Sequence, residues 1–391
     1  MAKEMKNLAK ETAIYGLSSI VGKFLNWLLV PLYTFVLQQS ADYGIVTNLY
    51  AWTALLLVIL TYGMETGFFR FANKEENDPN KVYSTTLTCV GFTSLVFAAC
   101  CVVFCQPIAN ALGYPTHKEF IAMLGVVVSM DAFGSIPFAY LRYKRRPIKF
   151  AALKLFMIFM NIAFNLFFLL LCPWLMTHAP ALVDWFYKPD YGVGYVFVSN
   201  FISTSLVTLA LIPDMRVKFS FDWALLKRML HYSLPLLVLG IAGIMNQTVD
   251  KIIFPFLMPD KELAASELGI YGACFKIAMV MMMFTQAFRY AYEPFIFAKH
   301  KDKNSVGVYA DAMKYFVIFS LLILLGMLFY LDIIKLIIHP SYWSGMRVVP
   351  IVLFSYIFQG VFFNLSLWYK LTDKTQYGAY FSIMGLVITL L

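Results

Sequence analysis

Residues 120–173 read FIAMLGVVVSMDAFGSIPFAYLRYKRRPIKFAALKLFMIFMNIAFNLFFLLLCP. Two hydrophobic runs, 120–143 and 148–173, enclose a short and strongly basic loop. Each run has the roughly 20 apolar residues that a helix needs to cross the hydrocarbon core of a bilayer. Short loops with many bases are typical of the cytoplasmic side of a membrane protein. The stretch therefore predicts two transmembrane helices joined by a cytoplasmic loop. The bases of that loop are Arg142, Lys144, Arg145, Arg146 and Lys149.

The same alternation continues along the whole chain. Its composition, with 61% hydrophobic residues, 14% charged residues and a mean hydropathy of +0.71, lies outside the range of soluble globular proteins. We therefore expect an all-α polytopic membrane protein with eleven hydrophobic segments, ending inside the eleventh helix and continuing beyond it in the complete protein. The segments are 12–37, 44–70, 83–106, 120–143, 148–173, 194–213, 231–257, 268–297, 307–331, 346–369 and 376–391.

Lysine and arginine alternate between the loops. Of the 31 bases, twenty lie in one set of loops and five in the other, which predicts that the N-terminus and the basic set are cytoplasmic. The net charge of +9 thus reflects topology, with anionic membrane lipids as partners and no nucleic acid. The basic set holds Lys3, Lys6, Lys10, Arg70, Lys74, Lys81, Arg142, Lys144, Arg145, Arg146, Lys149, Arg216, Lys218, Lys227, Arg228, Lys299, Lys301, Lys303, Lys370 and Lys374. The other set holds Lys118, Lys188, Lys261, Lys335 and Arg347.

Residue types that carry catalysis are dispersed. The six cysteines lie inside apolar runs and form no CxxC pair, and the five histidines are scattered along the chain. The longest loop, 174–193, is too short for a soluble catalytic domain. We therefore expect no enzyme, no cofactor and no metal site.

The two halves of the chain resemble each other. Tyr15-Gly-Leu-Ser-Ser-Ile20 opens the first segment and Tyr232-Ser-Leu-Pro-Leu-Leu237 opens the seventh; Tyr43-Gly-Ile45 and Leu268-Gly-Ile270 open the second and the eighth. Six helices separate the copies, an even number, so both copies have the same orientation. We expect a parallel pseudo-repeat of two six-helix lobes around a central cavity. The first lobe is 1–222, and 223–391 supplies helices 7–11 of the second.

Several motifs of the chain resemble one membrane-protein family. They are Gly63-Met-Glu-Thr-Gly-Phe-Phe-Arg70, Pro137-Phe-Ala-Tyr-Leu-Arg142, Val249-Asp-Lys-Ile-Ile253 and Leu268-Gly-Ile-Tyr-Gly-Ala-Cys-Phe-Lys276. Together they resemble the Wzx-type oligosaccharide flippases of the multidrug/oligosaccharidyl-lipid/polysaccharide exporter superfamily, over essentially the whole chain. A chain that ends in the eleventh helix departs from the twelve or fourteen helices of that family.

The resemblance implies a function. Such proteins carry an undecaprenyl-diphosphate-linked oligosaccharide from the cytoplasm to the periplasm by alternating access around a V-shaped cavity. The expected location is the bacterial inner membrane, and the expected pathway is the biosynthesis of a polysaccharide: the O-antigen of lipopolysaccharide, a capsule or an exopolysaccharide. Polymerase components of that pathway are expected as further partners.

Ten ionisable residues lie within the hydrophobic segments or at their edges: Lys23, Glu65, Asp131, Lys154, Asp250, Lys251, Lys276, Arg289, Glu293 and Lys314. Each costs about 2.5–3.5 kcal/mol to insert at the centre of a helix, so they should face protein or water. The six bases outnumber the four acids, which favours an anionic substrate. With Asn26 on the same stripe of the first helix as Lys23, the expected substrate-binding residues are Lys23, Asn26, Arg70, Lys251, Lys276 and Arg289. The carboxylates expected to take up a coupling proton or sodium ion are Glu65, Asp131, Asp250 and Glu293.

A structural interpretation of these charges stays open. Arg289 and Glu293 are four residues apart and could pair on one helix face, so that the charges only lock the bundle. Asp250 and Lys251 are adjacent and point about 100° apart on a helix, which makes them poor partners for one another. We expect each to find a partner elsewhere or to line the cavity.

Three other functions stay open. A multidrug cation antiporter belongs to the same superfamily, although a lumen with excess positive charge argues against cationic substrates. A lipid II flippase would share the cationic cavity. A membrane polymerase or ligase of the same pathway would be an enzyme, but such enzymes carry a large periplasmic loop that this sequence does not predict.

Overall fold

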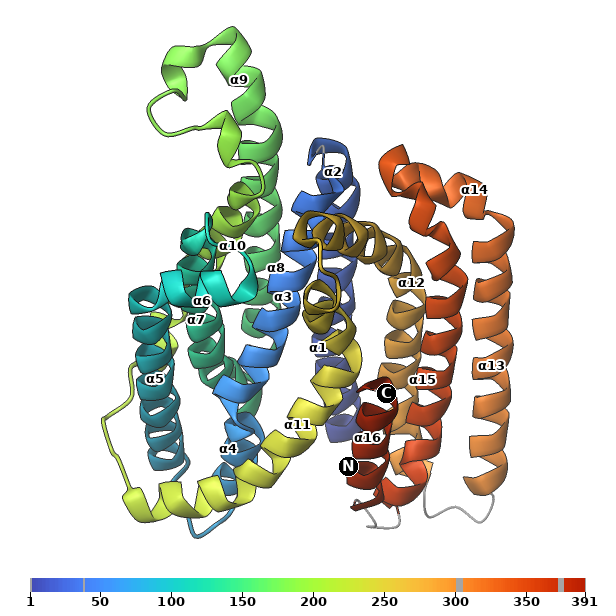
Figure 1. Ribbon diagram of the computed structural model, residues 1–391. Coiled ribbons are helices and arrows are strands. Elements are labelled where there is room, and N and C mark those ends of the chain that lie inside the picture. Colours follow the sequence, from blue (N-terminus) through green and yellow to red (C-terminus); the bar gives the residue numbers. More distant parts are fainter. Residues whose placement is uncertain (1, 38, 300–304, 372–375, 391) are drawn as a thin grey trace. The chain divides into compact units, whose positions relative to one another are not determined.

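The computed structural model describes the backbone of residues 2–37, 39–299, 305–371 and 376–390. Side chains are described at 15–37, 39–290, 292, 307, 309–366, 368, 377–378 and 380–389. Every regular element within this described part is a helix (Figure 1). The prediction of an all-α protein is confirmed.

Ten spans of the described chain are long and apolar enough to cross a membrane. They match the first ten predicted segments, and the eleventh corresponds to α16 (Gln376–Leu390), whose apolar part is Tyr380–Thr389. The prediction of a multi-pass membrane protein is thus confirmed. The spans are Tyr15–Val36, Ser40–Ala72, Pro79–Val103, Lys118–Tyr143, Pro147–His178, Gly194–Met215, Trp223–Leu257, Lys261–Tyr290, Tyr309–Phe329 and Pro340–Ser366.

Several helices begin earlier than their hydropathy predicts, among them α11 (Trp223–Leu257) and α12 (Lys261–Lys299). An aspartate precedes each of these two. Asp222 accepts a hydrogen bond of 3.0 Å from the backbone N–H of Leu225, and Asp260 caps α12 in the same way. A carboxylate there satisfies amides that have no partner inside the helix. The first turns are polar, so hydropathy alone missed them.

The helices group by contact into two compact units, which are 1–47 with 258–384 and 48–257 with 385–391. The first unit holds α1 (Ala2–Trp27), α2 (Leu29–Val36), α12, α13 (Ser305–Phe329), α14 (Leu331–Ile334), the 3₁₀ turns Lys335–Ile337 and Pro340–Arg347, and α15 (Val348–Leu371). In it, α12, α13 and α15 run side by side (Figure 1). A division by contacts does not compare one half of the chain with the other. The two lobes, 1–222 and 223–391, therefore stay a prediction.

The second unit is built around α7 (Lys118–Tyr143), which packs against α5, α8 and α10. Its core contains the fully buried side chains of Met64, Phe68, Tyr83 and Met229. The unit holds α4 (Met64–Ala72), α5 (Pro79–Val103), α6 (Cys105–Leu112), α7, α8 (Pro147–Leu166), the π-helical turn Phe167–Leu171, α9 (Cys172–His178), the 3₁₀ turns Pro180–Leu182 and Pro189–Tyr191, α10 (Gly194–Met215) and α11.

The second predicted segment is broken in the structure. It contains α3 (Ser40–Thr61) and α4, separated at Tyr62 and Gly63, which have φ values of 33° and 72°. Positive φ is costly for residues other than glycine, which fits Gly63 at the larger value. A Cβ on residue 63 would also lie 2.8 Å from the carbonyl oxygen of Ser233. The break re-aims α4, which carries Glu65 and Arg70.

The start of α3 crosses α12 closely. A Cβ on Gly44 would overlap the carbonyl oxygen of Ala265, and one on Gly269 would overlap that of Ser40. The hydroxyls of Ser40 and Ser266 are 2.5 Å apart. Small residues at such a crossing let two backbones approach, which is how helices associate where lipid removes the hydrophobic driving force.

Candidate functional site

In the first unit, Lys23 on α1 meets a neutral partner. Its ammonium group donates a hydrogen bond of 2.6 Å to the side-chain oxygen of Gln286 on α12. One turn later, the indole N–H of Trp27 donates to the backbone carbonyl of Lys276 at 2.8 Å. These two bonds join the helices, yet an amide satisfies an ammonium group without neutralising its charge. A positive charge therefore remains inside a membrane span.

The other predicted residues of this unit are dispersed over the two helices. Asn26 and the Lys276 side chain are exposed. Arg289 has its guanidinium carbon 5.0 Å from the centroid of the Phe363 ring, and it lines a cavity of about 10 Å³ that has room for about one water molecule. Glu293 lies outside the described side chains, so its pairing with Arg289 stays a prediction.

In the second unit, the short helix α4 presents Glu65 and Arg70 differently. Glu65 forms an ion pair with Arg142 at the end of α7. Arg70 is exposed, with its guanidinium carbon 4.0 Å from the centroid of the Tyr232 ring on α11. A guanidinium on a ring face keeps its charge and its five donors, so Arg70 can still bind an anion. Glu65, which the sequence offered as a candidate carboxylate for a coupling ion, thus has a basic partner.

Asp131 on α7 and Lys154 on α8 are partly buried charges of the second unit. The two charges interact electrostatically with each other, and Lys154 also interacts electrostatically with Glu65 and Arg142. The ammonium group of Lys154 lies 4.1 Å from the centroid of the Phe138 ring. Two acids and two bases thus form one charge cluster within this unit, in which Lys154 takes part although the sequence did not single it out as a site residue.

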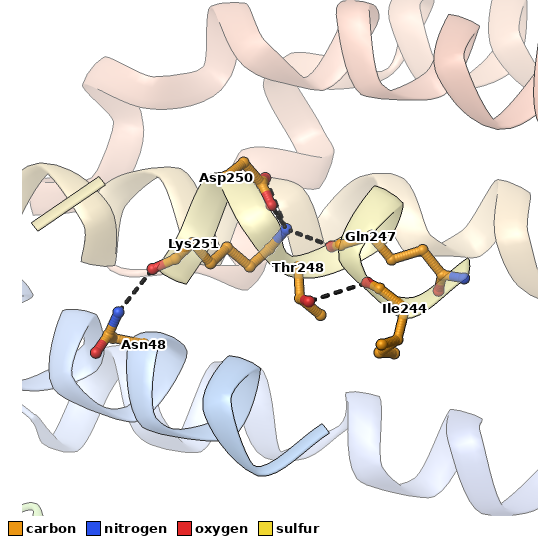
Figure 2. A network of polar contacts seen from close by, with 6 residues as sticks. All are labelled: Asn48, Ile244, Gln247, Thr248, Asp250 and Lys251. Atoms are coloured by element: carbon orange, nitrogen blue, oxygen red, sulfur yellow. Dashed lines mark hydrogen bonds and ion pairs between the residues drawn. The ribbon is translucent and has the colours of Figure 1, made fainter. Parts of the chain in front are cut away.

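Asp250 and Lys251 on α11 contact each other, so the expectation that these two neighbours would be poor partners for one another was wrong (Figure 2). The ammonium group of Lys251 lies 2.8 and 3.1 Å from the two carboxylate oxygens of Asp250. It also donates to the carbonyl of Gln247 at 3.2 Å. The flexible lysine stem folds back along the helix, which the angle between Cβ atoms does not forbid. Asn48 on α3 donates to the backbone carbonyl of Lys251 at 2.7 Å and fixes this turn.

Of the predicted site residues, the structure pairs Asp250 with Lys251. The others whose side chains are described contact residues that were not predicted as site residues or lie exposed. Sequence reasoning missed Gln286 and Arg142 as partners because they lie far from Lys23 and Glu65 along the chain, and no local pattern links them. Within the described residues, no group of three or more His, Cys, Asp or Glu side chains is placed to hold a metal ion.

Comparison with known families gives the chain its place. Residues 37–347 match the family described as "Polysaccharide biosynthesis protein", which is most of the chain. This chain belongs to the polysaccharide biosynthesis protein family. No curated protein matches it in sequence.

Solved structures share the fold of this polysaccharide biosynthesis protein at low identity. An inward-facing multidrug resistance MATE family transporter of the MOP superfamily matches with a TM-score of 0.61 and 12% identity, covering 90% of this chain and 81% of that one. A MATE protein in complex with MaD3S matches with a TM-score of 0.58 and 12% identity, covering 90% and 82%. The MATE multidrug transporter DinF-BH matches with a TM-score of 0.56 and 16% identity, covering 96% and 85%.

Family and fold agree with each other. The family is that of polysaccharide biosynthesis proteins, and the fold is shared with solved structures that are described as MATE multidrug transporters. The resemblance found from the motifs of the sequence is thus confirmed. The polysaccharide biosynthesis protein is a polytopic membrane protein whose fold is shared with MATE transporters.

Proposed function

We propose that this protein moves an oligosaccharide linked to a polyprenyl diphosphate across the bacterial inner membrane during polysaccharide biosynthesis, by alternating access. The direction is from the cytoplasm to the periplasm. Membership of a polysaccharide biosynthesis family supports the sugar part of this proposal. The lipid diphosphate part rests on the charges inside the spans.

One observation carries the proposal: the positive charge of Lys23 is paired with the neutral Gln286 inside a span. A base that served only to lock the bundle would be expected opposite a carboxylate, since an unneutralised charge in a membrane is costly. An anionic substrate would compensate this charge when it binds. Arg70, stacked on Tyr232, offers a second base of the same kind in the other unit.

The membrane potential favours this direction of transport. Moving one negative charge outward across an inside-negative membrane gains about 2.3 kcal/mol per 100 mV. A diphosphate carries enough charge for the potential alone to bias export. A coupling proton or sodium ion would add direction if it bound the two states of the cavity with different affinity.

Asp250 is the carboxylate that we propose for this coupling. Its partner Lys251 is nearly buried, with 11% of its side chain exposed, whereas 37% of the Asp250 side chain is exposed. An ion can therefore reach the carboxylate while the lysine stays in place. Binding of a cation at Asp250 would compete with Lys251 and release the lysine toward an anionic substrate.

Flipping in proteoliposomes tests the proposal. The substrate is a fluorescent undecaprenyl-diphosphate-linked oligosaccharide, and the measurement is the fraction that a membrane-impermeant quencher reaches. We expect flipping that depends on the protein and that falls in the Lys23→Met variant. Absence of flipping by the well-folded wild type would contradict the proposed function.

A second candidate, efflux of cationic drugs, is favoured by one observation. The fold is shared with MATE transporters that are described as multidrug proteins. Ethidium efflux from the same proteoliposomes tests it. Efflux of ethidium without flipping of the lipid-linked sugar would make the antiporter the better account.

A further inference from the structure

The loop after α9 contains an open cleft with a volume of about 520 Å³. Asp184, Tyr187, Lys188, Asp190 and Tyr191 line it. This volume falls within the range of clefts that hold small molecules. None of the intramembrane charges described above belongs to it.

The cleft lies at the opposite membrane face from the basic loop 142–149. A single span, Pro147–His178, leads from that loop through α8 to α9 and to the cleft. Figure 1 shows α9 and the following loop beyond the end of α8 (green). Because the basic loop is predicted to be cytoplasmic, the cleft is on the side where an exported substrate arrives.

The aromatic wall of the cleft is held in place by α10. The rings of Tyr187 and Tyr195 stack with their centroids 4.9 Å apart, and the Tyr195 hydroxyl accepts a hydrogen bond of 2.7 Å from the backbone N–H of Lys188. The ring of Tyr191 lies so close to Gly194 that a Cβ there would overlap it. The wall is therefore formed before any ligand binds, which reduces the entropic cost of binding.

The charged groups of the cleft are available to a ligand. The side chains of Asp184, Lys188 and Asp190 are exposed, and none forms an ion pair with another described residue. Burial raises the pKa of Tyr191 to about 12, so its hydroxyl stays protonated and can donate a hydrogen bond. The two carboxylates can accept hydrogen bonds from adjacent hydroxyl groups of a sugar, and the ammonium group can donate one to a ring oxygen or a hydroxyl oxygen of that sugar.

We propose that this cleft binds a neutral sugar unit of the exported oligosaccharide, on the far side of the membrane from the basic loops. The partly exposed ring of Tyr191 presents a flat apolar face to the C–H groups of a pyranose, whereas the buried ring of Tyr187 supports the wall. The carboxylates bind the hydroxyls of the sugar. Two acids and one base leave the cleft net negative, which disfavours a diphosphate. The inference rests on the proposed function, because it assigns a receiving site to the same cargo.

Saturation-transfer NMR tests the cleft on the full chain in nanodiscs, with free glucose, galactose, N-acetylglucosamine and glucuronate as separate probes. We expect transfer to at least one neutral sugar, and less transfer to glucuronate than to glucose because its added carboxylate is repelled. Tyr191→Ala and Asp190→Asn should each weaken binding of that sugar about tenfold, which corresponds to one hydrogen bond to a charged group or one stacked ring.

The matched control is Trp185→Ala. Trp185 lies in the same loop and is 82% exposed, but it does not line the cleft. Sugar binding should be unchanged in this variant. If Tyr191→Ala fails to fold, the exposed Asp184→Asn replaces it, with the same expected loss.

Three results would overturn the inference: no transfer to any neutral sugar, equal binding in the Tyr191→Ala and wild-type proteins, or calcium binding that depends on Asp190 in a protein that binds no sugar. The flipping assay separates this inference from the proposed function. Flipping without sugar binding at the cleft would contradict only the proposed sugar site. Sugar binding without flipping would contradict only the proposed transport of the lipid-linked sugar.

Discussion

The ammonium group of Lys23 lies 2.6 Å from the side-chain oxygen of Gln286, which is 263 residues further along the chain. The bond joins α1 to α12 and leaves the lysine charged. A carboxylate in place of this amide would make the same contact but would cancel the charge. Replacing Gln286 by glutamate therefore distinguishes the structural role of Lys23 from its electrostatic role.

We predict that Gln286→Glu lowers flipping of the lipid-linked sugar while preserving the contact between the helices. An interaction with a charged group contributes about 1.5–3 kcal/mol, so the apparent affinity for the diphosphate should fall about tenfold or more. Lys23→Met should lower it similarly. The measurement is the concentration dependence of flipping. Undiminished affinity in Gln286→Glu, with normal expression, would mean that Lys23 only joins two helices.

Asp250→Asn should weaken the dependence of flipping on a pH or sodium gradient more than it weakens lipid binding. The change keeps the shape of the side chain and removes the charge that an ion would bind. Transport in proteoliposomes with an imposed gradient measures this. Asp250→Asn with Lys251→Met is the control, because it removes both members of the pair seen in Figure 2. Two results together would mean that the pair is only structural. The double variant would restore a protein yield that Asp250→Asn had lost, and the dependence of flipping on the gradient would be the same in all variants.

The crossing of α3 with α12 predicts a strong size limit at Gly44 and Gly269. Gly44→Ala and Gly269→Ala should each destabilise the protein by about 1–3 kcal/mol, because the added methyl overlaps a backbone carbonyl of the other helix. Gly326→Ala on α13 is the matched control, since no atom lies within 4 Å of a Cβ there. That variant should be neutral or slightly stabilised. Thermal unfolding in detergent measures both, and equal melting of all three variants would contradict the crossing.

The cap of α11 should be sensitive to acid. The hydrogen bond from Lys81, with its ammonium group 2.7 Å from a carboxylate oxygen, and the backbone N–H of Leu225 lower the pKa of Asp222 below its ordinary value of 3.8. A lowered folded-state pKa stabilises the folded form above the ordinary value, and this contribution is lost as pH falls through the lowered pKa.

Hydrogen exchange at the start of α11 should therefore increase as pH falls below about 4, once the intrinsic effect of pH on exchange is removed. In Asp222→Asn the exchange should be faster at neutral pH and should lose this acid step. If Asp222→Asn showed the same increase in exchange at the same pH as the wild type, the acid step would belong to another carboxylate.

The orientation predicted from the bases can be measured directly. In a background without the six cysteines, a cysteine at Arg145 should react with an impermeant thiol reagent only from the cytoplasm. A cysteine at Lys188 should react only from outside. The reverse pattern at both positions would invert the predicted topology and would place the proposed sugar cleft in the cytoplasm.

The sequence by itself determined the class of the protein and the number and order of its spans. Hydrophobic length is set by the thickness of the bilayer, so a run such as 148–173 predicts a helix without knowledge of its neighbours. The motifs of the sequence together indicated a family of polysaccharide exporters, and the match to a polysaccharide biosynthesis family agrees with them. The charges inside the spans could also be found, since lipid makes each of them exceptional.

Only the tertiary structure decided which partner each charge has. Gln286, Arg142 and Phe138 approach Lys23, Glu65 and Lys154 because separate helices pack together, and no local spacing encodes that contact. The contact of Asp250 with Lys251 depended on the bending of a flexible side chain, which helical geometry leaves free. At Gly63 the chain lies close to the backbone of Ser233, and beside the cleft the Tyr191 ring lies close to Gly194. Such contacts are properties of packed surfaces rather than of hydropathy.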